Sequence, residues 1–80
     1  MTINILAFGI AKEIMGGASI SQILDAEATV AGLKDTLEIA YPKLRQLTSY
    51  AVAVNNEYAS DDVVINQQDE IAIIPPVSGG

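Results

Sequence analysis

The sequence predicts an α+β domain: a mixed sheet of four or five strands with one main helix on one face. Three observations support this: strand-like alternation at 2–8 and 70–74, one long helical pattern at 30–41, and no repeat or linker dividing the 80 residues. A chain of this length buries only about 60 to 65% of its unfolded surface, so the core is modest. We expect residues 1–80 to form one domain, with residues 75–80 as a protruding C-terminal tail.

Two strands joined by a short turn are expected in the first 24 residues. The stretch TINILAF (2–8) alternates, which places its first two isoleucines on one face and Leu6 and Phe8 on the other. The stretch IAKEIM (10–15) is closed by a Gly-Gly pair and predicts about one helical turn. A second strand is then expected over ASISQIL (18–24).

The main helix is predicted over VAGLKDTLEIAY (30–41). Thr29 is a suitable N-cap, and the apolar residues that follow recur at three- and four-residue spacings. Pro42 prevents a simple continuation of this helix. The next residues, KLRQL (43–47), are therefore expected to form a separate turn that packs through its two leucines.

A hairpin is predicted after this turn. The stretches AVAVN (51–55) and EYA (57–59) flank Asn56, and asparagine tolerates the left-handed backbone angles of tight turns. The stretch DVVIN (62–66) predicts a further short strand. The overall order is therefore strand, strand, helix, strand, strand, strand.

The last strand, EIAII (70–74), ends at a Pro-Pro pair that lacks backbone donors. If this strand neighbours the first one, its alternation brings Ile74 beside Phe8. A single helix leaves that sheet face uncovered, so we expect an exposed apolar patch of the kind that marks partner surfaces. The alternative is that loops, including the 10–15 turn, fold over the patch.

The charge balance limits the classes of partner. The net charge is −6, and residues 46–80 carry five acidic residues and no basic one. This sign repels nucleic acid and anionic lipid surfaces, so we expect neither nucleic acid nor membrane as a partner. No apolar run approaches the roughly 20 residues of a spanning helix, and no secretory signal opens the chain. We expect a soluble, cytoplasmic protein.

The usual catalytic groups are missing from the sequence. The chain has no histidine, no cysteine and no phosphate-binding glycine loop, so we expect no bound metal and no active site of its own. Its remaining chemical handle is the C-terminal carboxylate of Gly80, which is ionised at neutral pH and must be activated before it can react. Activation by a nucleotide phosphate would make it an acyl donor.

The residues before this carboxylate suit entry into a narrow channel. Glycine has no side chain to obstruct passage, and prolines limit the freedom lost on threading. The residues expected to thread are Pro75, Pro76, Val77, Ser78, Gly79 and Gly80. The alternative is that the terminal glycines are a frayed end without a role.

The element order, the acidic composition and the ending IAIIPPVSGG together resemble the small subunit of molybdopterin synthase, the MoaD-like branch of the ubiquitin-like β-grasp sulfur carriers. The opening INILAFGIAKEIMGG is similar to the opening of that family. The resemblance spans the whole chain. It implies a β-grasp fold and the role of sulfur-carrier subunit, with no permanently bound cofactor.

The resemblance also implies a reaction sequence. A MoeB-like enzyme would use ATP to adenylate Gly80, which is then converted to a thiocarboxylate. The tail would enter a MoaE-like large subunit, in a heterotetramer of two small and two large subunits, and give sulfur to cyclic pyranopterin monophosphate to form molybdopterin. By motif, the large subunit would contact Phe8 and Ile74, and Lys12 stands where relatives carry arginine.

Three other functions remain open. A ThiS-like carrier would supply sulfur for thiazole synthesis, although PPV before SGG argues against it. A ubiquitin-like modifier would form isopeptide bonds to lysines. A plain binding module would use the sheet surface without the tail.

Overall fold

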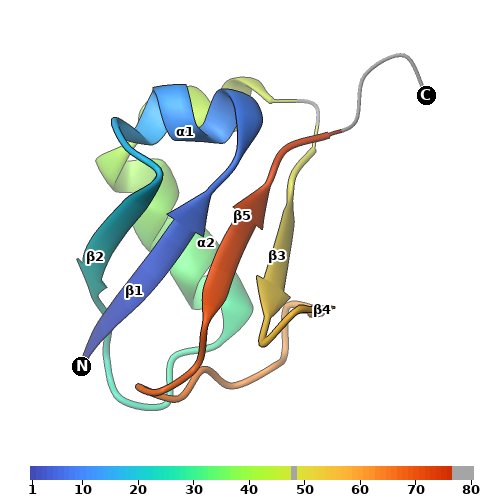
Figure 1. Cartoon of the computed structure of the whole chain (residues 1–80). Coiled ribbons are helices and arrows are strands. Elements are labelled where there is room, and N and C mark those ends of the chain that lie inside the picture. The colour runs from blue at the N-terminus through green and yellow to red at the C-terminus, as the bar shows by residue number, and fades with distance from the viewer. Residues whose placement is uncertain (48, 77–80) are drawn as a thin grey trace.

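Two strands from opposite ends of the chain lie side by side at the centre of the structure, a computed structural model that describes residues 1–47 and 49–76. They are β1 (Thr2–Ala7) and β5 (Ile71–Ile74), which pair in parallel (Figure 1). Both alternate as the sequence predicts, and their odd-numbered residues are almost fully buried. This pairing confirms that the first and last strands are neighbours.

Three further strands complete a five-stranded mixed sheet in the order β2-β1-β5-β3-β4. They are β2 (Ser19–Ile23), β3 (Ala51–Val54) and β4 (Glu57–Tyr58), and each pairs antiparallel with its neighbours. The α+β class, the mixed sheet and the strand order along the chain are confirmed. The sequence could not choose between four and five strands because β4 has only two residues.

The main helix, α2 (Val30–Ala40), covers one face of the sheet (Figure 1). Its cap is the predicted one, because the Thr29 hydroxyl accepts a hydrogen bond from the Gly32 amide at 3.2 Å. Leu33 and Leu37 are fully buried against the isoleucines of β1 and β5. The following turn is a short 3₁₀ helix, η1 (Pro42–Gln46), anchored by a buried leucine as expected.

The segment between β1 and β2 differs from its prediction. It forms a seven-residue helix, α1 (Gly9–Met15), about two turns long, and not the single turn expected over 10–15. Its Ala11 and Met15 are buried in the same core as the apolar residues of α2. The segment therefore lies on the helical face and does not cover the opposite face of the sheet.

The predicted strand over residues 62–66 is wrong. The segment makes one isolated bridge, between Thr29 and Val64. Its backbone binds the start of α2 instead. The Asp61 and Val63 carbonyls accept hydrogen bonds from the first backbone amides of the helix, at 3.0 and 2.9 Å. Helix N-termini leave such amides without intrahelical partners, so this loop acts as a cap and cannot pair as a strand.

The hairpin between β3 and β4 is confirmed, and its loop is one residue longer than predicted because Asn55 belongs to the turn and not to the strand. Its loop is Asn55–Asn56, and both residues have positive φ, 53° and 69°. Two such residues make the primed turn that matches the twist of paired strands. The Asn55 side chain donates to Asp69 at 3.0 Å and accepts from the Glu70 amide at 2.9 Å, which fixes the hairpin to the start of β5.

The chain leaves the sheet at the end where α1 lies (Figure 1). After β5, Pro75 is half-buried and Pro76 is exposed. A Cβ added at Gly9 would lie 3.1 Å from Pro75 Cγ, so the first proline rests against the start of α1. The predicted tail residues 77–80 lie outside the described residues. Within the part of the chain that the structure describes, no helix is long and apolar enough to cross a membrane.

Candidate functional site

The sheet face opposite the helices carries a row of four side chains in register. Leu6 of β1 pairs with Ala72 of β5, Ala72 with Ala53 of β3, and Ala53 with Tyr58 of β4. The row thus reads large, small, small, large across four neighbouring strands. Because side chains directly opposite each other lie about 5 Å apart, the two alanines leave a depression between the larger residues.

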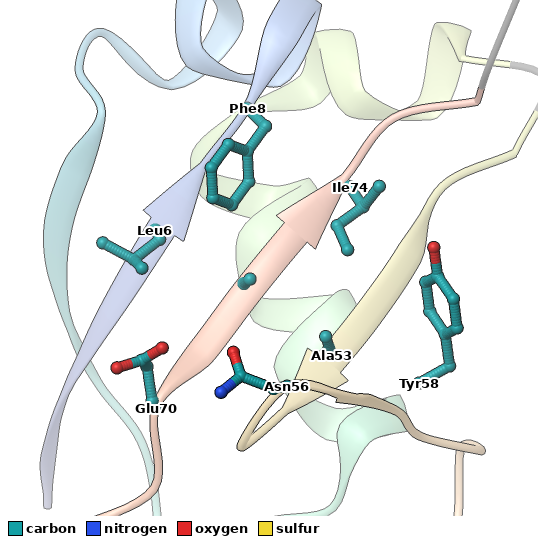
Figure 2. Close-up of a pocket in the computed structure, with 8 residues that line it drawn as sticks. Leu6, Phe8, Ala53, Asn56, Tyr58, Glu70 and Ile74 are labelled. Carbon is teal, nitrogen blue, oxygen red and sulfur yellow. The ribbon is translucent and has the colours of Figure 1, made fainter.

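This depression is a hollow of about 280 Å³. Phe8 and Ile74 stand at its end nearest the tail, and Asn56 and Glu70 at the other (Figure 2). Its lining residues are Leu6, Phe8, Ala53, Asn56, Tyr58, Glu70, Ala72 and Ile74. We call this site the sheet hollow. It is an apolar depression with a polar rim at one end, the general form of a binding surface.

Phe8 and Ile74, the predicted interface residues, lie on this same face. Phe8 follows β1 directly, and its amide donates to the Ile73 carbonyl at 3.3 Å. The Phe8 side chain is 50% exposed and Ile74 is half-buried. The pair therefore forms an uncovered apolar surface within the described residues, immediately before Pro75.

Lys12, the third residue predicted for the interface, is placed differently. It is exposed on α1 and is not part of the lining of the sheet hollow. Its backbone carbonyl accepts the amides of Gly16 and Gly17 at 3.0 and 3.1 Å, which closes α1. The structure therefore gives Lys12 a backbone role in ending the helix, and its contact with a partner stays a prediction.

Sequence reasoning missed several residues of the hollow. Ala53 and Ala72 contribute by being small, which a sequence pattern shows only once the strand register is known. Tyr58 is 76% exposed and forms the outer wall of the hollow (Figure 2). A large aromatic residue on a two-residue edge strand is the signal that could have marked it.

The sheet hollow and the surface beside α2 carry different charged residues. Glu70 is the charged residue of the hollow lining, and it is exposed. Lys34 is paired with Asp61 at 2.9 Å and Arg45 with Glu38 at 3.4 Å, both beside α2. The hollow therefore presents negative charge at its rim, and these two cations are engaged elsewhere.

Beside α2, a second hollow is lined by side chains that form a network of polar contacts. There the Tyr50 hydroxyl donates to Glu38 at 2.6 Å, and Lys34 lies 5.7 Å from the Tyr50 ring centre. Burial, reinforced by the Glu38 carboxylate, raises the pKa of Tyr50 well above its usual value. This network ties β3 to α2 and η1 and presents no free catalytic pair.

The predicted chemical handle, Gly80, and the threading residues Val77, Ser78 and Gly79 lie outside the described residues. Elsewhere, across residues 1–47 and 49–76, no three histidine, cysteine, aspartate or glutamate side chains come together as a possible metal site. The arrangement that the structure does show is an uncovered apolar sheet face, from which β5 and two prolines lead toward the C-terminus.

Comparison with known proteins places this chain in a family. The ThiS family matches residues 5–80. A curated molybdopterin synthase sulfur carrier subunit of Dictyostelium discoideum is 45% identical, over 96% of this chain and 94% of its own length. The one of Arabidopsis thaliana is 35% identical, over 98% of this chain and 82% of its own length.

A solved structure agrees with the fold. The crystal structure of SAMP1 from Haloferax volcanii superposes with a TM-score of 0.83, at 29% identity and over 100% of both chains. The ubiquitin-like β-grasp fold is therefore confirmed. This chain belongs to the ThiS family, among relatives that are molybdopterin synthase sulfur carrier subunits.

Proposed function

We propose that this protein is the sulfur-carrier small subunit of molybdopterin synthase and that it carries sulfur on Gly80. A MoeB-like enzyme uses ATP to join AMP to the Gly80 carboxylate and releases pyrophosphate, and sulfur supplied at the sulfide level then displaces AMP to leave a thiocarboxylate. Each loaded tail gives one sulfur to cyclic pyranopterin monophosphate and returns to the carboxylate, so two loaded carriers supply the two sulfurs of the molybdopterin dithiolene. ATP and sulfur are transient reactants, so the carrier holds no permanent cofactor.

The observation that carries this proposal is the family match through the last residue. It extends from residue 5 to Gly80, in a chain with no cysteine to hold sulfur elsewhere. The relatives that match nearly the whole chain are named as sulfur carrier subunits of molybdopterin synthase. A backbone carboxylate can carry sulfur without any thiol side chain.

The docking partner we propose is the MoaE-like large subunit. Phe8 and Ile74 form the uncovered apolar surface, and the chain continues from Ile74 directly into Pro75 and Pro76. A protein bound there receives the tail without any rearrangement of the sheet. We propose residues 75–80 as the threading tail of a single domain, and a cytoplasmic heterotetramer of two small and two large subunits as the assembly.

The direct test of sulfur loading is intact mass. After incubation with ATP, the activating enzyme and a sulfur donor, the chain should gain the mass difference of one oxygen replaced by one sulfur. Deleting Gly80 should abolish the gain and leave the melting temperature unchanged, because the tail follows the packed strands. An unmodified chain, alongside a control carrier that is loaded in the same mixture, would reject the proposal.

A second candidate is protein modification, favoured by the likeness to SAMP1, a small archaeal modifier protein. In that case, cells should contain higher-mass conjugates of this chain that disappear when Gly80 is deleted. A ThiS-like carrier for thiazole synthesis would instead copurify with a thiazole synthase. These outcomes distinguish the sulfur carrier for molybdopterin, the protein modifier and the sulfur carrier for thiazole synthesis, which all act through the C-terminal glycine.

A further inference from the structure

We propose that the sheet hollow is a socket for one large apolar side chain of the large subunit, flanked in that subunit by a lysine or arginine that pairs with Glu70. The inference rests on the proposed function, because it names what the docking partner inserts. It goes beyond an apolar docking face by assigning a position and a size to the inserted side chain and a positive charge to a residue beside it in the large subunit.

The floor of the socket sets the size of its occupant. Ala53 and Ala72 are adjacent in register, and their small side chains open the space between Leu6 and Tyr58. An apolar cavity of about 150 Å³ holds a benzene molecule. The 280 Å³ of this hollow, part of which is open to solvent, therefore has room for one leucine- to phenylalanine-sized group.

The position of the hollow points to the protein that receives the tail. Ala72 precedes Pro75 by three residues, which is about 10 Å along an extended chain. Ile74 belongs to the lining and is also the last residue of β5. An inserted side chain would thus hold the partner within about 10 Å of the point where the tail begins.

The rim of the hollow sets the charge of the partner residue beside the inserted side chain. Glu70 is exposed at the end of the hollow away from the tail (Figure 2), and its backbone amide donates to the Asn55 side chain at 2.9 Å. Among the residues that the structure describes, no lysine or arginine lines the hollow, and residues 46–80 of the sequence contain none. A cationic group beside the inserted side chain is therefore complementary to this rim.

The test fills the socket without touching the core. Because the chain has no cysteine, Ala72→Cys introduces one thiol at the floor. Ser21→Cys is the matched control: Ser21 is exposed on β2 and pairs with Asn4, outside the hollow lining. Each variant, with its tail unloaded, is measured for affinity to the large subunit before and after alkylation with N-ethylmaleimide.

The expected result is that alkylation weakens the binding of Ala72→Cys to the large subunit at least tenfold relative to the same variant before alkylation, a loss of about 1.4 kcal/mol or more. Alkylated Ser21→Cys should bind like the original chain. Circular dichroism melting of each adduct verifies the fold. Equal binding before and after alkylation of Ala72→Cys would overturn the socket, as would an equal loss in both alkylated variants.

The charge is tested separately with Glu70→Gln. It should weaken binding about three- to fivefold at low salt, the range for a rim ion pair, and the loss should fade at high salt. Glu57→Gln is the control, because Glu57 lies on β4 next to Tyr58 but points to the other face by alternation. Equal effects of the two variants would overturn the assigned cation.

The failure of the socket is distinguishable from failure of the proposed function. If the original chain does not bind the large subunit at all, the proposed function fails. If it binds and the socket variants bind equally well, only the socket fails. If alkylated Ala72→Cys blocks adenylation by the activating enzyme but leaves large-subunit binding intact, the hollow serves that enzyme and the inference is wrong.

Discussion

Phe8 offers a quantitative test of the docking face. Phenylalanine buries about 150 to 250 Å² when fully enclosed. Because the residue is 50% exposed, roughly 100 Å² remains for a partner to cover. At about 25 cal/mol per Å² this area contributes up to about 2.5 kcal/mol. The costs of ordering an interface lower the net value, so we expect about 1 to 2.5 kcal/mol.

The perturbation is Phe8→Ala, and the assay is calorimetric titration with the large subunit. The expected result is binding weakened by about 5- to 60-fold. Ile39→Ala is the matched control, because Ile39 is 74% exposed on α2, on the helical side of the sheet. Its affinity should stay within about twofold. A folded Phe8→Ala chain with undiminished affinity would refute the docking face.

Two further predictions concern the networks that hold the fold. Tyr50→Phe removes the hydrogen bond to Glu38 and should cost about 1 kcal/mol of unfolding free energy at pH 7 in urea titrations. The raised pKa of Tyr50 means that the fold favours the neutral phenol. Its contribution to the free energy of unfolding is therefore complete below pH 10 and is lost as the pH rises further. If Tyr50→Phe lost the same stability at alkaline pH, the assignment of this effect to Tyr50 would be wrong. Asn55→Ala removes a residue suited to φ 53° and two side-chain hydrogen bonds, and should cost about 1 to 3 kcal/mol. If Asn55→Ala melts at the same temperature as the control Ser21→Ala, the hydrogen bonds of Asn55 do not stabilise the fold.

Most of the fold could be predicted because local patterns and tertiary structure agree. The alternation in β1 and β5 assigned faces correctly, and Thr29 and Pro42 marked the start and end of the main helix. The predictions were wrong where contacts between distant segments determine the local structure. The 62–66 segment has a strand-like composition, but its carbonyls are used by α2, and α1 lengthens because its apolar residues reach the shared core.

The site could be predicted in part. Phe8 and Ile74 followed from alternation together with the assumption that their strands are neighbours, which the structure confirms. The socket depends on Ala72 and Ala53 being opposite each other, and that register is held by the hydrogen bonds of Asn55 to Asp69 and Glu70 at the start of β5. Such a relation links residues 19 positions apart and has no local signal.

The central claim is that the reactive group is the backbone carboxyl of Gly80. Its most direct test is a chain extended by one alanine after Gly80, assayed in a reconstituted synthase with the activating enzyme, ATP and a sulfur donor. We expect this chain to bind the large subunit but to acquire no sulfur and to support no molybdopterin formation. Molybdopterin formation with the added residue still present by mass spectrometry would contradict it.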